Sequence, residues 1–320
     1  MVRKVKKKKS GIRIFVALLL KVGIAAFVYK SIIIPGYQHI FEKEYDDKIS
    51  SKIEPGPSVS ISPDKLNSPT AILIRLKDYT TLMQKNSEEK IYPASLTKMM
   101  TAIVAIENLP DLKKEIKLTN STFQGLYKAD ASMAGFQPGE KVRGIDLIYG
   151  VLLPSGAEAS IALADKIAGS EQGFVKMMNK KAADLGMDNT NFENATGLHD
   201  ENHYTTVKDL AILLSYVLQN DTFRKVFTSS RHSTPPTNKH PDGITFYSTM
   251  FEDLNNQNII DGEILGGKTG YTDEAGLNLA SLAKVGNQEY VLVTAGAKGN
   301  HKSEQYNITD ALAVYNSIRK

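Results

Sequence analysis

Serine and lysine residues recur in this chain at a spacing that could support nucleophilic catalysis. In Ser95-x-x-Lys98 the two side chains would lie on one face of a helix, because residues three apart are neighbours on a helix surface. A lysine whose pKa is lowered by burial can take the proton of a serine hydroxyl and so activate the oxygen as a nucleophile. The pattern alone is weak evidence, because it begins at five serines: Ser62, Ser87, Ser95, Ser281 and Ser317.

The copy at Ser95 differs from the others because a long apolar helix is expected to follow it. Apolar residues recur there at helical spacing: Leu96, Met99, Met100, Ile103, Val104 and Ile106. A lysine within this helix would be partly desolvated, as a general base requires. Ser95 could also be no more than the helix N-cap. Upstream, residues 70–92 alternate between apolar and polar types and predict a β-hairpin with its turn at 85–87.

Two other segments place polar residues beside apolar runs. Ser155 follows the apolar residues 147–153 in PSGAEAS and, taken alone, is an ordinary turn residue. Lys268-Thr269-Gly270 lies among glycines and precedes two predicted strands, LNLASLAKV and EYVLVTAG. It is either a glycine-rich turn with an exposed lysine or an edge strand that binds a carboxylate, its glycines allowing close backbone approach.

The order of these motifs is more specific than any one of them. Ser95-x-x-Lys98, then Ser155, then Lys268-Thr269-Gly270 resembles the arrangement in the penicillin-recognising serine enzymes. Among these, the sequence over about residues 68–300 is similar to the low-molecular-mass D-alanyl-D-alanine carboxypeptidases of the peptidase S11 type. The segments that carry the resemblance are YPASLTKMMTA (92–102), ASMAGFQPGEKVRGIDLIYGVLLPSGAEAS (131–160), NFENATGLHDENHYTTVKDLA (191–211) and GGKTGYTDEAGLNL (266–279).

The resemblance implies a serine-type D-Ala-D-Ala carboxypeptidase that works through an acyl-enzyme. Ser95 would be the nucleophile, Lys98 the general base and Ser155 the proton relay. The backbone N–H groups of Ser95 and Tyr271 would form the oxyanion hole. The segment Lys268-Thr269-Gly270 would bind the substrate and hold its terminal carboxylate. The resemblance implies no cofactor and no metal.

One position departs from the family pattern. The family usually has Ser-x-Asn where this chain has Ser155-Gly156-Ala157, and the asparagine would bond the substrate amide and help to orient the lysine pair. Alanine offers no polar side chain. The loss of this contact is therefore expected to cost a free energy on the scale of removing an oxyanion-hole donor. Glu158 follows directly, but neighbouring residues on a helix or turn generally face different ways. His203, in the family-like HYTT segment, is interpreted as structural, and the histidines show no His-Glu-x-x-His zinc pattern.

The resemblance also implies an α/β (α+β) fold of the β-lactamase/transpeptidase type. We expect an antiparallel sheet sandwiched by helices, with a mainly helical subregion at about 110–225. The C-terminal QYNITDALAVYNSIRK suits a last helix packed on the sheet, so the second β-domain common in the family is expected to be missing. The expected domain order is a basic cytoplasmic tip (1–11), a transmembrane signal-anchor (12–34), a proline-rich linker (35–66) and a penicillin-binding D,D-peptidase domain (67–320).

The N-terminal charge pattern indicates export. Lysine and arginine crowd residues 3–13, no acidic residue precedes Glu42, and the apolar residues 12–34 would reach about 34 Å as a helix, enough to span a bilayer. This predicts a single-pass anchor in a bacterial cell membrane, with the catalytic domain on the extracytoplasmic face. Lys21 weighs against the anchor, because inserting a charged side chain near the bilayer centre costs about 3 kcal/mol. The alternative is a signal peptide that is cleaved near residues 23–25.

Composition limits the partners. The net charge of +4 comes from the basic tip, so a nucleic-acid partner is not indicated, and a chain without cysteine has no disulfide or thiolate-metal site. The expected partners are peptidoglycan stem peptides ending in D-Ala-D-Ala, β-lactams as covalent inhibitors, and the cell membrane. The alternatives are a D,D-transpeptidase or endopeptidase, and a catalytically weakened binder of stem peptides or β-lactams, which Ala157 favours. A β-lactamase fits less well, because Ser-Asp-Asn and an evident deacylating glutamate are missing.

Overall fold

The computed structural model describes residues 59–255 and 257–318. The predicted tip and anchor and most of the predicted linker lie outside this part of the chain. Within it, no helix combines the length and apolar character needed to cross a membrane. The last residues of the predicted linker contact the folded domain, because Val59 forms a β-bridge with Ile318 and Leu66 is buried.

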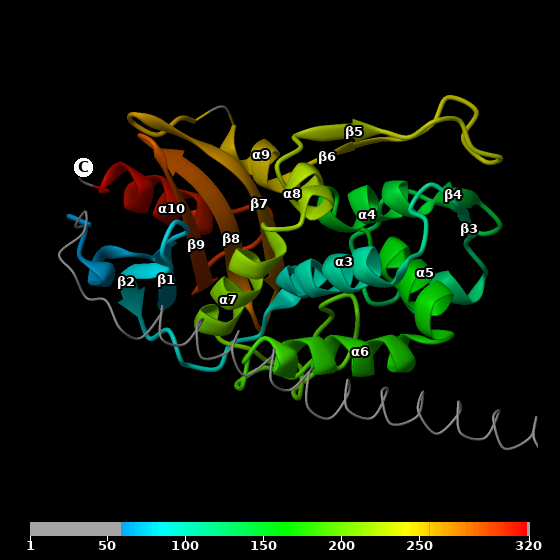
Figure 1. Ribbon diagram of the computed structural model, residues 1–320, viewed down its shortest axis with the longest axis horizontal. Coiled ribbons are helices and arrows are strands. Elements are labelled where there is room, and N and C mark those ends of the chain that lie inside the picture. Colours follow the sequence, from blue (N-terminus) through cyan, green and yellow to red (C-terminus); the bar gives the residue numbers. More distant parts are fainter. Residues whose placement is uncertain (1–58, 256, 319–320) are drawn as a thin grey trace, which may run out of the picture. The chain divides into compact units, whose positions relative to one another are not determined.

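A five-stranded antiparallel sheet forms the centre of the domain. Its strand order is β2-β1-β9-β8-β7, so strands from the two ends of the described chain lie side by side (Figure 1). The strands are β1 (Thr70–Arg75), β2 (Thr80–Lys85), β7 (Gly262–Thr272), β8 (Gly276–Val285) and β9 (Gln288–Ala297). The two strands expected from LNLASLAKV and EYVLVTAG are confirmed as β8 and β9. Because β7 pairs only with β8 in this sheet, its other edge is free to meet the segment that carries Ser95.

Helices cover both faces of the sheet, which confirms the predicted α/β sandwich. They are α3 (Thr97–Asn108), α4 (Gly144–Leu152), α5 (Ala157–Ala168), α6 (Glu171–Asp184), α7 (Val207–Val217), α8 (Asp221–Phe227), α9 (Thr249–Leu254) and α10 (Tyr306–Asn316), with single 3-10 turns η2 (Pro63–Lys65), η3 (Ala94–Leu96) and η4 (Ser121–Phe123). One face packs against α9 and α10, the predicted last helix, and the other against α3, α7 and α8 (Figure 1).

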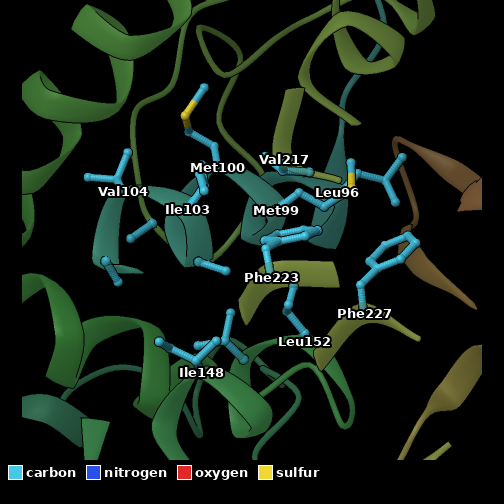
Figure 2. Close-up of a cluster of buried hydrophobic side chains, with 14 of the residues drawn as sticks. Leu96, Met99, Met100, Ile103, Val104, Ile148, Leu152, Val217, Phe223 and Phe227 are labelled. Atoms are coloured by element: carbon cyan, nitrogen blue, oxygen red, sulfur yellow. The ribbon is translucent and has the colours of Figure 1, made fainter. Parts of the chain in front are cut away.

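The alternation of side chains on the strands divides the core in two. On β8, Leu279 points into the cluster around α10, whereas Ala280 and Leu282 point into the larger cluster around α3. Figure 2 shows how deeply α3 sits in the larger cluster, with Met99 beside Phe223 and Phe227 of α8. Burial of these apolar side chains is the main stabilising contribution in such a core. It fixes α3, and therefore the position of Lys98.

Two local expectations are wrong. The turn of the first hairpin lies at residues 76–79 rather than 85–87, because the Asp78 carboxylate accepts hydrogen bonds from the Arg75 guanidinium and from the Thr80 N–H and so closes a tight turn there. The α-helix begins at Thr97, and Ser95 lies before it in η3, where no side chain makes an N-cap hydrogen bond.

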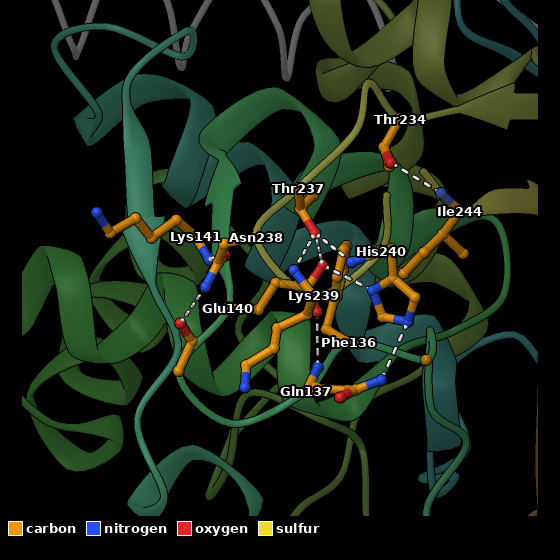
Figure 3. Close-up of polar contacts among 12 residues, drawn as sticks. Phe136, Gln137, Glu140, Lys141, Thr234, Thr237, Asn238, Lys239, His240 and Ile244 are labelled. Atoms are coloured by element: carbon orange, nitrogen blue, oxygen red, sulfur yellow. Dashed lines mark hydrogen bonds and ion pairs between the residues drawn. The ribbon is translucent and has the colours of Figure 1, made fainter. Parts of the chain in front are cut away.

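Two small two-stranded sheets, one within the helical subregion and one after it, are not revealed by periodicity. The pairs β3 (Glu115–Lys117) with β4 (Lys141–Arg143) and β5 (Arg231–Ser233) with β6 (Thr245–Tyr247) each have three-residue strands. The loop between β5 and β6 reaches back to the turn before β4, where the buried Glu140 accepts hydrogen bonds from Thr237 (2.7 Å) and His240 (2.9 Å) (Figure 3). Glu140 also accepts from the N–H of Gln137 at 2.8 Å, which fixes that turn.

Asn278 connects the sheet to the segment that precedes Ser95. It is 0% exposed on β8; its Nδ2 donates to the carbonyl of Tyr92 at 2.9 Å, and its Oδ1 accepts from the N–H of Gly296 at 2.9 Å. Both partners are main-chain groups of partly buried residues. The amide therefore ties β9 and the loop at residues 92–94 to β8.

Replacing Asn278 with leucine is expected to destabilise the fold by about 2–4 kcal/mol. The substitution leaves a carbonyl and an N–H of partly buried residues without their partner, and each such group costs about 1–3 kcal/mol where water cannot replace the bond. Denaturant unfolding measures the change in the free energy of unfolding. As a control, Asn191→Leu removes a bond to the carbonyl of Asn202 near the surface, which water can replace, and should cost less than about 1 kcal/mol. Equal losses in the two variants would contradict the role given to Asn278.

Candidate active site

Ser95 lies on a strained and tightly held piece of backbone. The preceding residue, Ala94, has φ = 46°, a left-handed conformation that is unfavourable for a residue with a Cβ. A Cβ on Gly197 would lie 1.9 Å from the Ala94 carbonyl oxygen, and a Cβ on Gly270 would lie 3.0 Å from the Ser95 nitrogen. These two glycines therefore permit the close approach of a loop and of β7 to the serine, and their contacts hold the strained turn in place.

Lys98 is placed to accept the proton of Ser95. Its side chain is 2% exposed, and its Nζ lies 3.1 Å from the Ser95 Oγ and 2.6 Å from the carbonyl oxygen of Thr196. Burial lowers the pKa of Lys98 to about 7, against the opposing effect of the Glu158 charge. Near neutral pH a large fraction of the amine is therefore unprotonated. In that form it can donate to Thr196 and accept from the serine hydroxyl at the same time.

Ser155 presents a hydroxyl that nothing in the described residues satisfies. It is 4% exposed, and its Oγ has no hydrogen-bond partner there. Its φ of 66° is again left-handed, directly before α5. Buried polar groups without partners are rare, and strained backbone gathers at functional sites. A free hydroxyl held in this way is available to a bound molecule, as a proton relay must be.

The lysine, threonine and glycine of the third motif lie on β7, on the edge strand that the sequence suggested. Lys268 is 1% exposed, and its Nζ donates to the carbonyl of Thr269 at 2.8 Å. Burial and the neighbouring Lys98 together hold the pKa of Lys268 well below its usual range. The hydroxyl of Thr269 shares a hydrogen bond of 2.7 Å with that of Thr249 on α9. A bound carboxylate would add a negative charge beside Lys268 and so favour the protonated form of this lysine.

A cavity of about 120 Å³ brings these segments together. Of the residues that the sequence identified, Ser95, Ser155, Thr269, Gly270 and Tyr271 line it, and Lys98 reaches it through its bond to Ser95. The sequence analysis missed the other lining residues, which are Ser132, Thr249, Glu252, Asp253, Leu277, His301, Gln305 and Asn307. They come from segments far apart in the chain and carry no local signal.

His203 has the contacts of a structural residue. Its Nδ1 accepts the N–H of Glu193 at 3.2 Å, so its Nε2 carries the proton and donates to the Thr97 hydroxyl at 2.8 Å. Burial lowers the pKa of His203 to about 4, which keeps the ring neutral near pH 7. The ring thereby links the start of α3 to the segment that supplies the Thr196 carbonyl.

Ala157 does not line the cavity, and its neighbour Glu158 faces another segment. Ala157 is 1% exposed, and its N–H donates to the carbonyl of Ser132 at 2.8 Å. Glu158 is buried against residues 134–136. Within residues 59–255 and 257–318, no group of three or more histidine, aspartate and glutamate side chains is placed to hold a metal ion.

The fold is the β-lactamase/transpeptidase-like fold of solved DD-transpeptidases and D-alanyl-D-alanine carboxypeptidases, and the chain is a serine-type enzyme of this class. The chain belongs to the D-alanyl-D-alanine carboxypeptidase family, peptidase S11, which it matches over residues 58–299. It is 37% identical over 234 residues to the D-alanyl-D-alanine carboxypeptidase DacF of Bacillus subtilis, covering 71% of this chain and 57% of that protein. It is 34% identical over 243 residues to DacC of Escherichia coli, covering 70% and 56%. The chain thus spans little more than half the length of these curated relatives.

Solved structures show the same relationship. The Streptomyces K15 DD-transpeptidase aligns with a TM-score of 0.71 and 25% identity, over 80% of this chain and 98% of that chain. A D-alanyl-D-alanine carboxypeptidase from Mycobacterium tuberculosis aligns with a TM-score of 0.70 and 25% identity, over 83% of this chain and 95% of that chain.

The rate at which Ser95 is acylated is expected to rise with pH along a limb whose midpoint lies near 7. Lys98, with a pKa of about 7, can accept a proton only in its unprotonated form, so activity is lost as pH falls through this value. Lys98→Arg replaces the amine by a group that stays protonated and should slow acylation by about 10²–10⁴-fold. Stopped-flow acylation by a fluorescent β-lactam measures both effects.

Lys181→Arg provides the control for the arginine substitution. Lys181 is a partly buried lysine paired with Glu107 at 2.6 Å, away from the cavity, and the change keeps its charge. Its acylation rate should match that of the unmodified chain. A flat pH profile between about pH 5 and 9, or rapid acylation of Lys98→Arg, would remove Lys98 from the role of base.

Proposed function

We propose that this protein is a membrane-anchored serine D,D-carboxypeptidase that removes the terminal D-alanine from peptidoglycan stem pentapeptides and is inhibited by β-lactams. The observation that carries the proposal is the pairing of the Ser95 Oγ with the Lys98 Nζ at 3.1 Å, at the wall of a cavity that also contains Ser155 and the edge of β7. The family membership and the names of the relatives support the choice of substrate.

The first half of the proposed reaction forms an acyl-enzyme. The proton of the Ser95 hydroxyl moves to the Lys98 Nζ as the oxygen attacks the carbonyl carbon of the D-Ala-D-Ala peptide bond. The backbone N–H groups of Ser95 and Tyr271 stabilise the negative charge that develops on the carbonyl oxygen. The terminal carboxylate of the substrate is held by Lys268 and Thr269, and close approach of the peptide to β7 is possible because residue 270 is a glycine.

The second half releases the products. The proton on Lys98 passes through the Ser155 hydroxyl to the leaving nitrogen as the carbon–nitrogen bond breaks, and free D-alanine leaves. Water then attacks the ester carbonyl, giving its proton to Lys98, and the shortened peptide departs as the Ser95 hydroxyl is restored. The unpartnered state of the Ser155 hydroxyl supports this role, because no group in the described part of the chain competes for its hydrogen bonds.

The anchor is part of the proposal. The apolar residues 12–34, preceded by a basic tip, would hold the catalytic domain at the extracytoplasmic face of a bacterial cell membrane. This would keep the cavity close to its polymer substrate. Sequencing the N-terminus of the mature protein tests it, because a chain that begins near residue 26 would have a cleaved signal peptide instead.

A D,D-transpeptidase is the second candidate, because the same acyl-enzyme can be captured by an amine. It is favoured by the likeness to the Streptomyces K15 DD-transpeptidase, of which the chain covers 98%. The two activities are separated by incubating the enzyme with a D-Ala-D-Ala pentapeptide and an added amine acceptor such as glycylglycine. Hydrolysis yields the tetrapeptide, and transfer yields a product that contains the acceptor.

Covalent labelling tests the nucleophile. A fluorescent penicillin is expected to label the chain, whereas Ser95→Ala, which removes the attacking oxygen, should show no label. Ser87→Ala is the matched control, because Ser87 begins another Ser-x-x-Lys sequence but lies outside the cavity. The unmodified chain should also release D-alanine from the pentapeptide. Labelling without D-alanine release or transfer would favour the weakened binder, and labelling of Ser95→Ala would remove Ser95 from the mechanism.

The alanine at 157 has a measurable consequence. Ala157→Asn is expected to raise the rate of acylation by about 2- to 10-fold, because one added hydrogen bond to a substrate amide contributes about 0.5–1.5 kcal/mol. The gain is smaller than the full effect of an oxyanion-hole donor, because the buried position must make room for the larger side chain. Ala157→Leu has similar bulk but no amide, and the buried position makes a lower rate the expected result. The same pentapeptide assay compares the two. If both substitutions change the rate equally, the alanine is not a handicap that an asparagine would repair.

A further inference from the structure

Glu158 is a buried carboxylate to which the proposed reaction gives no role. Its side chain is 0% exposed, and its Oε1 accepts hydrogen bonds from the backbone N–H groups of residues 134–136, at 2.7, 2.9 and 3.2 Å. Its Oε2 is also buried and has no hydrogen-bond partner among the described residues. Burying a carboxylate is costly unless its surroundings compensate, so this one is retained against a penalty.

The three N–H groups belong to residues 132–136, which we call the wall segment. Ser132 of this segment lines the catalytic cavity, and its carbonyl accepts the N–H of Ala157. A Cβ on Gly156 would lie 2.6 Å from the Cβ of Ala134, so the segment packs directly on the turn that carries Ser155. Glu158 therefore fixes the wall segment against the start of α5.

A second buried glutamate follows the wall segment at its other end. Glu140 accepts the N–H of Gln137 at 2.8 Å and hydrogen bonds from Thr237 and His240 (Figure 3). Both glutamates are 0% exposed, and both bind backbone N–H groups of the same stretch of chain. The two glutamates differ in their electrostatic effect, because Glu158 raises the pKa of Lys98 and Glu140 does not act on it.

The charges around Lys98 give Glu158 its second role. The positive charge of Lys98 is disfavoured by burial and favoured by the Glu158 carboxylate on α5. The charge of Lys98 in turn lowers the pKa of Lys268 on β7. Asp253 on α9 acts on Lys268, and His301 acts on Asp253. The loop at residues 194–198 reaches Lys98 with the Thr196 carbonyl, which is uncharged. Burial raises the pKa of Glu158, whereas its hydrogen bonds from the backbone N–H groups of residues 134–136 lower it and so favour the charged form. Among the described residues, Glu158 is the carboxylate whose charge acts on the proposed base.

We propose that Glu158 is a positioning residue of the active site, which fixes the wall segment through three backbone N–H groups and provides the counter-charge of Lys98. Its Oε1 makes all three hydrogen bonds to the wall segment, and its Oε2 has no hydrogen-bond partner among the described residues. It orients this side of the cavity from the position next to Ala157, where the chain has no polar side chain. The inference rests on the proposed function only in using acylation of Ser95 as one of its two readouts.

Glu158→Gln separates the two tasks. The amide oxygen can still accept the three N–H groups, but the negative charge is gone. The midpoint of the pH–acylation limb is expected to fall by about 1 pH unit, because an opposite charge nearby favours the protonated lysine and its removal favours the free amine. Hydrogen–deuterium exchange should show unchanged protection of the amides of residues 134–136. Glu158→Ala should shift the midpoint likewise and also lose that protection.

Glu140→Gln is the matched control on the same stretch of chain. It should leave the midpoint within about 0.2 pH units of the unmodified chain, because its charge is not coupled to Lys98. An unmoved midpoint in Glu158→Gln, or an equal shift in Glu140→Gln, would overturn the counter-charge role. Full amide protection of residues 134–136 in Glu158→Ala would overturn the wall role.

The test stays decisive if Glu158→Gln does not fold. Glu158→Asp then replaces it, since the shorter side chain keeps the charge but cannot reach all three N–H groups. The expected result is lower protection of residues 134–136 with a midpoint close to that of the unmodified chain, and the reverse pattern would overturn the proposal. If the unmodified chain is not acylated at all, the proposed function fails, and the exchange measurement still decides the wall role.

Discussion

The burial of the Lys98 side chain is the constraint on which the rest of the site depends. An exposed lysine would stay protonated at neutral pH and could not take a proton from serine. At 2% exposure the charged form is disfavoured, and the pKa falls to about 7. That burial is achieved by the packing of α3 into the larger core cluster (Figure 2). The apolar residues of α3 are therefore part of the chemistry as well as of the stability.

Strained backbone at two turns is the second constraint on the site. Ala94 and Ser155 both have left-handed backbone conformations, which cost about 1–3 kcal/mol each for residues with a Cβ. Such conformations persist only where the surroundings determine them. Gly197 and Gly270 confine the turn before Ser95, and the wall segment packs closely on Gly156 beside Ser155. The two hydroxyl groups are thus held on turns that come from distant parts of the sequence but meet in one cavity.

The sequence predicts the strongly periodic elements and the order of the motifs well. The long helix after Ser95, the strands β8 and β9 and the last helix each have a clear apolar pattern. The motif order, through its resemblance to a family, named five of the residues that line the cavity, which are Ser95, Ser155, Thr269, Gly270 and Tyr271. The turn of the first hairpin was misplaced because it depends on one carboxylate, that of Asp78, which competes with a more conspicuous polar run at 85–87.

The remainder of the site could not be predicted because it depends on contacts between distant segments. Ser132, Thr249 and Asp253 line the cavity, yet none has a sequence pattern that distinguishes it from an ordinary surface residue. Glu158 shows most clearly what the sequence alone could not predict. From its position beside Ala157 it was expected to face away from the missing asparagine, and it does turn toward residues 134–136. Only the packing of those residues on α5 shows that this direction leads back to the wall of the cavity.

Lys98 and Lys268 are both buried in one small site, where their positive charges are disfavoured unless negative charges lie nearby. Burial disfavours the protonated forms of both lysines, and the charge of Lys98 adds to this effect on Lys268. Glu158 beside Lys98 and Asp253 near Lys268 supply the opposing charges from α5 and α9. In the proposed reaction the substrate brings a further carboxylate, which favours a proton on Lys268. A proton there disfavours one on Lys98, so binding of the anionic end of the substrate promotes the free amine that Ser95 requires.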